Sequence, residues 1–231
     1  LGRGLTDKDI KPRAVLSAIS NAKNEMRNAE DFSASTRGPR EQKIAELFFA
    51  YEKALKDTSA LDFDDLLIKT VELLRSKPDI RHKWQQQFEH ILIDEYQDTN
   101  AVQYALIKLL VNSRRNLCVV GDDAQSIYSF RGADYTNILN FERDFPGTTV
   151  VKLEQNYRST GAILNMANAL ISHNIHRTDK SLWTANGDGV EPKLWQLYNE
   201  SEEALAIANE IQAQIANGRQ YGDVAVLYRT N

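Results

Sequence analysis

Apolar residues in the first ninety positions recur every three or four residues, which is the spacing of amphipathic helices. One set begins after Pro12, and a second follows the polar stretch 31–40. A third set begins behind the acidic Asp62 and ends before Pro78, a residue that interrupts helices, and a short fourth helix is expected after it. The residues that define the four faces are Val15, Ile19, Ala22 and Met26; Ile44, Leu47, Phe48, Tyr51 and Leu55; Phe63, Leu66, Leu67, Val71 and Leu74; and Ile80, Trp84 and Phe88.

From position 91 onward, short runs that are apolar throughout replace this pattern. The runs 91–93 and 117–120 are each followed by acidic residues, as expected for buried strands of a parallel sheet. A helix is predicted between them over 100–111, where Asn100 and Gln103 have the spacing of a capping box. The alternation predicts an open α/β fold with a parallel sheet. Its further elements are predicted as a helix over 134–145, a strand over 150–153, helices over 160–171 and 204–215, and strands over 194–198 and 224–228.

Composition places the chain among ordinary globular proteins, because 42% of its 231 residues are hydrophobic and 26% are charged. Its apolar runs are far shorter than the roughly 20 residues that cross a bilayer. The single cysteine, Cys118, lies in a run predicted to be a buried strand, so we expect no intrachain disulfide and a cytoplasmic protein. The net charge of −4 argues against blanket electrostatic capture of nucleic acid. The chain starts at Leu1 without a methionine and stops directly after a predicted strand, which suggests an excised piece.

Acidic pairs follow two of the predicted strands. Asp94-Glu95 comes after the first strand, and Asp122-Asp123 comes shortly after the second. Either pair alone is equally well explained as a solvated turn. Two pairs in consecutive βα units predict a Mg²⁺-dependent phosphate site, since the carboxyl ends of parallel strands share one edge and Mg²⁺ prefers oxygen ligands. A receiver-type phosphoacceptor domain is excluded because its acidic pair would follow its first strand, whereas a complete βα unit precedes Asp122 here.

Three longer strings specify the chemistry further. Residues 91–100 read ILIDEYQDTN, residues 119–133 read VVGDDAQSIYSFRGA and residues 153–159 read LEQNYRS. In this order and at these intervals, they closely resemble motifs II, III and IV of superfamily 1A DNA helicases of the UvrD/Rep/PcrA type. LDFDDLL at 61–67 and VAVLYRTN at 224–231 are also similar to that family, so the resemblance covers essentially the whole chain. It implies an incomplete RecA-like parallel sheet with an N-terminal, all-helical insertion.

The resemblance implies a role for each matching residue of the nucleotide site. Asp94 would coordinate Mg²⁺ and Glu95 would act as general base. Gln125 would sense the γ-phosphate of ATP and link it to the DNA site. Tyr157 would stack on the nucleotide base, and Arg158 would reach the γ-phosphate as an arginine finger from the second motor domain.

The same resemblance implies a track for single-stranded DNA. Tyr128, Phe130 and Arg131 would line it, because aromatic faces stack on any base without reading its sequence. The family often has tryptophan where this chain has Phe130. Core packing is the alternative for the two aromatic residues, and a structural salt bridge is the alternative for Arg131.

Other polar residues receive structural interpretations. His173 and His176 have the spacing of metal ligands, but they lie in a loop with few partners and are interpreted as solvated. Asp98 and Asp122 are expected to support the Mg²⁺ site only indirectly. Three acidic residues at the start of a predicted helix are interpreted first as helix caps: Asp62, Asp64 and Asp65.

No GxxxxGK[ST] phosphate-binding loop occurs in the sequence. We therefore expect the middle of a helicase: part of the helical 1B insertion (1–60), the latter part of motor domain 1A (61–147) and the beginning of 2A (148–231). The parent would be an ATP-dependent helicase that translocates on single-stranded DNA, 3′ to 5′ in this family, and unwinds duplex DNA in repair or replication. This piece alone is expected to be inactive. The alternatives are a non-catalytic DNA-binding or interaction module and the helicase portion of a helicase-nuclease.

Overall fold

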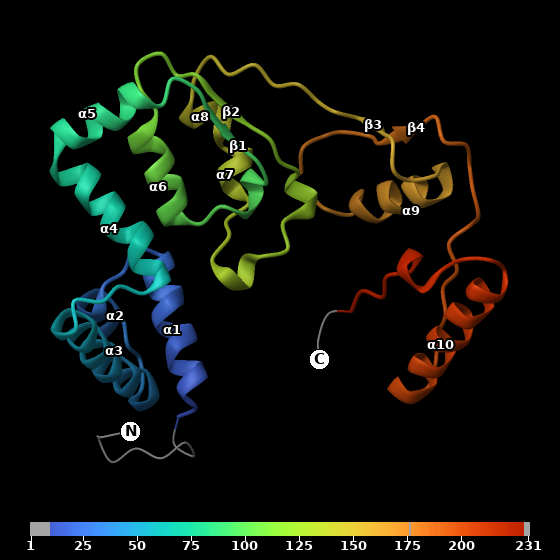
Figure 1. Cartoon of the computed structure of the whole chain (residues 1–231), viewed down its shortest axis with the longest axis horizontal. Helices are drawn as coiled ribbons and strands as arrows, with labels where there is room; N and C mark the ends of the chain where they lie inside the picture. Colours follow the sequence, from blue (N-terminus) through green and yellow to red (C-terminus); the bar gives the residue numbers. More distant parts are fainter. Residues whose placement is uncertain (1–9, 176, 229–231) are drawn as a thin grey trace. The chain divides into compact units, whose positions relative to one another are not determined.

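The computed structural model describes residues 10–175 and 177–228, and its helices and strands are shown in Figure 1. Contacts between residues divide the chain into two compact units. Unit 1 consists of Leu1–Leu153 and Ile171–Lys180, and unit 2 consists of Glu154–Leu170 and Ser181–Asn231. Residues 171–180 therefore belong to the first unit although they follow part of the second in sequence.

Three helices form the N-terminal part of unit 1: α1 (Pro12–Asn24), α2 (Ala29–Ala34) and α3 (Pro39–Asp57). Proline opens α1 and α3, at a position where its missing N–H has no helical partner. The Asn28 side chain caps α2 by accepting a hydrogen bond from the N–H of Asp31. The helical prediction for this region is confirmed, with α2 as an additional helix. The three helices share one core: Ile19, Ala22, Ala29 and Phe48.

Two further helices, α4 (Phe63–Ser76) and α5 (Pro78–Gln87), lead toward the sheet. Asp62 caps α4 by accepting a hydrogen bond from the N–H of Asp65, and the Asp65 side chain accepts one from the N–H of Asp62. The predicted capping role of these two residues is confirmed. Because α4 contacts α1, α5 and α6, it connects the helical region with the rest of unit 1.

Lys23 is buried between α1, α3 and α4, and it holds what we call the Lys23 cluster: Lys23, Tyr51, Glu52, Asp62 and Asp65. Its ammonium lies 2.8 Å from a carboxylate oxygen of each acidic member, and the Tyr51 hydroxyl donates a hydrogen bond to Asp62. Burial acts to lower the pKa of Lys23, but hydrogen bonds to the three carboxylates raise it above its ordinary value. Burial likewise acts to raise the pKa of Asp62, but hydrogen bonds from Lys23 and neighbouring groups hold it below its ordinary value. Lys23 and Asp62 are therefore both charged, and the cluster joins α1 and α3 to the start of α4.

The sheet of unit 1 consists of two adjacent parallel strands, β1 (Ile91–Ile93) and β2 (Leu117–Val119), connected by α6 (Ala101–Leu110). Asn100 caps α6 and forms the predicted capping box with Gln103. The predicted βαβ unit is confirmed. One face of the sheet packs on a core centred on Tyr96, Ile107 and Phe141.

The other face of this sheet is open, so the expectation of strands buried on both sides was wrong. Leu92 and Cys118 form a register pair on that face, and both are exposed. Successive strand residues point to opposite faces, so a core on one side covers only every second residue. Cys118 is therefore an exposed thiol.

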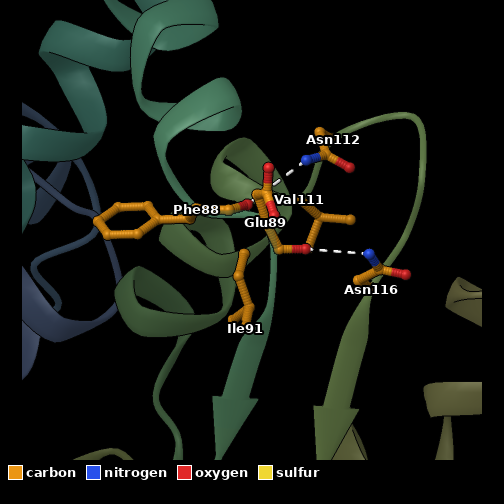
Figure 2. A pocket seen from close by; sticks show the side chains of 6 residues that line it. All are labelled: Phe88, Glu89, Ile91, Val111, Asn112 and Asn116. Carbon is orange, nitrogen blue, oxygen red and sulfur yellow. Dashed lines mark hydrogen bonds between the residues drawn. The ribbon is translucent and has the colours of Figure 1, made fainter.

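Amide side chains close the end of the sheet where the strands begin, as Figure 2 shows. Asn112 donates a hydrogen bond to the carbonyl oxygen of Phe88 (3.4 Å), and Asn116 donates one to that of Glu89 (3.1 Å). The Gln85 side chain donates to two carbonyl oxygens at the C-terminal end of α6, those of Leu109 (2.9 Å) and Val111 (3.2 Å). These bonds connect α5, the end of α6 and the strand starts at one end of the sheet.

The rest of unit 1 is less regular than predicted. The 3₁₀ turns η2 (Asp123–Gln125) and η3 (Ser129–Arg131) follow β2. The single helix expected over 134–145 is replaced by α7 (Thr136–Leu139) and α8 (Phe141–Asp144), which are separated at Asn140. The backbone of Asn140 departs from helical geometry (φ −92°, ψ 2°), and Phe141 behind it enters the core.

Unit 2 contains β3 (Gln155–Asn156), α9 (Gly161–Ile171), β4 (Trp183–Thr184), α10 (Glu200–Ala216) and the turn η4 (Tyr221–Asp223). β3 and β4 pair in parallel, and both predicted helices are present. Across the described residues, no helix is long and apolar enough to cross a membrane.

Three predicted strands, 150–153, 194–198 and 224–228, have no strand structure. Their apolar side chains are mostly exposed, for example those of Leu153, Leu194 and Leu227. A strand forms only where a neighbouring strand offers hydrogen bonds, and in the described part of the chain none pairs with these segments. Residues 229–231 lie outside the described residues.

Candidate nucleotide and DNA site

The carboxyl ends of β1 and β2 form one edge of the unit 1 sheet. The strands pair in register up to Ile93 and Val119, and two further backbone hydrogen bonds continue the ladder, from Val120 N–H to the Ile93 carbonyl (2.8 Å) and from Tyr96 N–H to the Val120 carbonyl (3.0 Å). The turns 94–98 and 121–125 are therefore adjacent. The structure brings Asp94, Glu95 and Gln125 to the same edge.

Glu95 projects from an unusual backbone conformation. Its φ of 52° lies in the left-handed region, which L-residues rarely adopt, and it precedes the 3₁₀ turn η1 (Tyr96–Asp98). The N–H of Glu95 donates a hydrogen bond to Asp94 Oδ1 (2.9 Å). Both carboxylates are exposed. This sharp turn places two neighbouring carboxylates at the strand end, which fits one metal ligand beside one base.

Gln97 connects the two turns. Its side chain is 1% exposed, donates a hydrogen bond from Nε2 to Glu95 Oε2 (2.7 Å), and accepts one at Oε1 from the N–H of Asp122 (3.0 Å). A Cβ at Gly121 would lie 2.5 Å from Gln97 Oε1, so only glycine allows this approach. The Glu95 carboxylate is therefore tied to the turn after β2 through a single amide.

Asp122 organises the second turn. Its carboxylate accepts hydrogen bonds from Ala124 N–H (3.0 Å) and Gln125 Nε2 (2.8 Å), and it forms an ion pair with Lys180. Burial acts to raise the pKa of Asp122, but hydrogen bonds from Lys180 and Gln125, together with the charge of Lys180, hold it below its ordinary value. Protein groups bind both carboxylate oxygens of Asp122, which favours the expected indirect support of the Mg²⁺ site. Asp98 has one buried carboxylate oxygen without a hydrogen-bond partner among the described residues.

Within residues 10–175 and 177–228, no three His, Cys, Asp or Glu side chains gather closely enough to hold a metal ion. Asp94 and Glu95 still fit Mg²⁺, which commonly takes only one or two carboxylates and completes its shell with water and phosphate oxygens. His173 is exposed, and His176 lies outside the described residues.

The predicted DNA-binding aromatic residues lie in and next to η3. Tyr128 is 38% exposed and Phe130 is 56% exposed, and their ring centroids are 6.0 Å apart. This exposure disagrees with the alternative of core packing within this chain. Gly132 ends the turn with a φ of 81°. The backbone of Arg131 belongs to η3, and its side chain lies outside the described part of the structure.

The two predicted nucleotide contacts of unit 2 follow β3. The Asn156 side chain accepts hydrogen bonds from the N–H groups of Arg158 (2.9 Å) and Ser159 (2.7 Å), which shapes a tight turn. The Tyr157 hydroxyl donates to Gln155 Oε1 (2.9 Å). Both Tyr157 and Arg158 are exposed. Unit 2 therefore presents an aromatic ring and a guanidinium from consecutive positions.

Comparison with known proteins agrees with the family resemblance of the sequence strings 91–100, 119–133 and 153–159. The UvrD/REP helicase N-terminal domain matches residues 3–146, and the UvrD-like helicase C-terminal domain matches residues 151–231. The chain belongs to the UvrD/REP helicase family. Two relatives are the ATP-dependent DNA helicases PcrA of Staphylococcus epidermidis, 45% identical, and of Staphylococcus aureus, 44% identical. Each alignment covers 98% of this chain and 31% of the relative, so the chain spans about a third of the relatives' length.

Two residues of this UvrD-type chain carry structural roles that the sequence analysis missed. Gln97 lies inside the string ILIDEYQDTN, but its burial between two turns depends on the pairing of β1 with β2. Lys23 occupies a helical position whose acidic partners are 29 to 42 residues away in the chain. For Gln97, the only signal in the sequence was its position two residues after Glu95, just beyond the first predicted strand.

Proposed function

We propose that the chain is part of a longer ATP-dependent DNA helicase that translocates on single-stranded DNA and unwinds duplex DNA with the energy of Mg²⁺-ATP hydrolysis. The observation that carries this proposal is the edge of unit 1, where the Glu95 carboxylate and the turn bearing Gln125 are linked through Gln97. Family membership and the PcrA relatives support it. The 3′ to 5′ direction rests on the family resemblance.

In the proposed reaction, Glu95 accepts the proton of the water that attacks the γ-phosphate. Its exposure lets a water reach the carboxylate. Asp94 would hold Mg²⁺, which when bound neutralises phosphate charge. Gln125 donates from an amide already oriented by Asp122 and contacts the γ-phosphate.

Unit 2 contributes Tyr157 and Arg158 to this proposal. The exposed ring would stack on the nucleotide base, and the guanidinium would bind phosphoryl oxygens, which its planar fork matches. In the proposed track for single-stranded DNA, Tyr128 and Phe130 would stack on bases, and Arg131 would contact the DNA strand. The same proposal includes the domain assignment: residues 1–60 belong to 1B, residues 61–147 to 1A and residues 148–231 to 2A. The two small parallel sheets are then parts of incomplete RecA-like domains.

For the 231-residue chain by itself, we propose no ATP turnover, because it carries no lysine-bearing phosphate loop. This same absence is the specific observation that favours a non-catalytic DNA-binding module as a second candidate for the chain alone. A cytoplasmic location is proposed for the longer protein.

The experiment that tests the proposed function replaces Glu95 with glutamine in the full-length protein. Glu95→Gln keeps the side chain's size and its capacity to accept from Gln97, so Mg²⁺-ATP affinity should persist while hydrolysis falls by about 10² to 10⁴. Glu89→Gln is the matched control, because Glu89 is exposed and lies at the other end of β1. If nucleotide affinity fell in parallel with turnover, Glu95 would shape the pocket and would not be the base.

A further inference from the structure

The Gln97 side chain has one hydrogen-bonding orientation that suits its surroundings. A carboxylate can only accept and a backbone N–H can only donate, so Nε2 must face Glu95 and Oε1 must face Asp122. Both bonds are short, at 2.7 Å and 3.0 Å, and the amide between them is planar. The group therefore fixes the distance between the Glu95 carboxylate and the backbone at Asp122.

Gln97 also contacts the segment that follows the turn after β2. Its backbone carbonyl accepts a hydrogen bond from the Ser126 hydroxyl (3.3 Å), which belongs to the segment leading to Tyr128. The carboxylate of Asp122 orients Gln125. A displacement of the turn after β2 would therefore move the amide that holds Glu95.

We propose that Gln97 is a positioning residue that couples the orientation of the Glu95 carboxylate to the turn carrying Gln125. This proposal rests on the proposed function, in which Glu95 is the base. In it, Gln97 touches neither nucleotide nor DNA. It restrains an exposed side chain that would otherwise sample several rotamers, so its loss should lower kcat and leave nucleotide binding unchanged.

Three variants of the full-length protein test the coupling. Gln97→Met keeps the length of the side chain and removes both bonds. Gln97→Glu keeps the acceptor for the Asp122 N–H and loses the donor to Glu95. Gln85→Met is the matched control, because Gln85 also donates two side-chain hydrogen bonds, at the opposite end of the sheet.

Single-turnover ATP hydrolysis and the dissociation constant of Mg²⁺-ATP should be measured on each variant. We expect both Gln97 variants to lower the hydrolysis rate by about 10- to 100-fold, with nucleotide affinity within about twofold of wild type, as for loss of orientation of a catalytic group. Gln85→Met should keep the wild-type rate per folded molecule. A Gln97→Glu variant with a wild-type rate would overturn the proposal.

The double variant Glu95→Gln/Gln97→Met separates positioning from general structural support. If Gln97 acts through Glu95, its replacement should change the residual rate of Glu95→Gln by no more than about twofold. A multiplicative loss in the double variant would show that Gln97 acts independently and would refute the coupling. A Glu95→Gln variant that hydrolyses ATP normally would instead refute the proposed function, so the two failures are distinct.

Discussion

Replacing Lys23 with methionine should destabilise unit 1 by about 3 kcal/mol at pH 7, the lower end of the usual 3–5 kcal/mol for removing one partner of a buried ion pair. Methionine fills nearly the same volume, so the loss comes from charge and hydrogen bonds and leaves no large cavity. The Asp65 side chain is only 6% exposed and would keep an uncompensated charge, whereas Glu52 is 38% exposed and can regain water. Asp62 keeps its hydrogen bonds from Tyr51 and Asp65, which places the estimate at the lower end.

Urea unfolding followed by Trp84 fluorescence measures this change, because Trp84 lies in α5, which packs on α4. For this experiment the other two tryptophans, Trp183 and Trp195, are replaced by phenylalanine in the wild-type and variant samples alike. Lys69→Met is the matched control on α4, since its ion pair with Glu72 is exposed and should contribute less than about 0.5 kcal/mol. A change below about 1 kcal/mol for Lys23→Met would show that the Lys23 cluster is hydrated and would refute the reasoning.

The pH dependence provides a second test of the Lys23 cluster. The lowered pKa of Asp62 contributes stability above about pH 4, and this is lost as the pH falls through the folded-state pKa. The raised pKa of Lys23 contributes stability below about pH 10.4, and this is lost as the pH rises through the folded-state pKa. In Lys23→Met this acid arm should shrink, because Asp62 loses the hydrogen bond and the charge of Lys23 that lower its pKa. The stability of the variant should therefore fall less than that of the wild type from pH 7 toward pH 3.

Two further sets of substitutions test the proposed DNA-binding aromatic residues and unit 2. In the full-length protein, Tyr128→Ala/Phe130→Ala should weaken single-strand binding by about 1–3 kcal/mol per lost stack with little change in melting temperature, and Phe130→Trp should restore or improve binding. A large loss of melting temperature with unchanged DNA affinity would instead indicate core packing, which typically costs about 3–5 kcal/mol per aromatic residue. In unit 2, Gly189→Ala should lower the free energy of unfolding more than Gly218→Ala, as measured by urea unfolding followed by Trp183 fluorescence. Both glycines have positive φ, but only a Cβ at Gly189 would clash, at 2.5 Å from Thr160. Equal losses would mean that backbone strain alone decides.

Local signals in the sequence predicted the helices and the first βαβ unit well. The proline at the start of α5, the capping box at Asn100 and the apolar run 91–93 each act within a few residues, so the pattern alone locates them. The edge carrying Asp94 and Glu95 could be predicted for the same reason, because two strand ends with acidic residues define it. Their roles in catalysis stay predictions.

Non-local interactions set the limits of that prediction. Lys23 appears in the sequence as an ordinary polar helix residue, and only the packing of α3 and α4 against α1 buries it. The run 150–153 has the composition of a strand but lacks a partner in the described part of the chain. The role of Gln97 could be predicted only by knowing that the turns after β1 and β2 become neighbours. In each case the deciding contact joins residues far apart in sequence.

The left-handed backbone at Glu95 means that stability and the proposed catalytic role favour different residues at this position. An L-residue with a side chain costs roughly 1–2 kcal/mol in this conformation, whereas glycine adopts it freely and asparagine more easily than most. A selection for thermal stability alone would therefore favour Gly or Asn at position 95 and remove the proposed base. The native glutamate keeps a local strain that the surrounding hydrogen bonds, above all that from Gln97, must offset. Stabilised variants of this chain obtained without an activity screen should be sequenced first at this position.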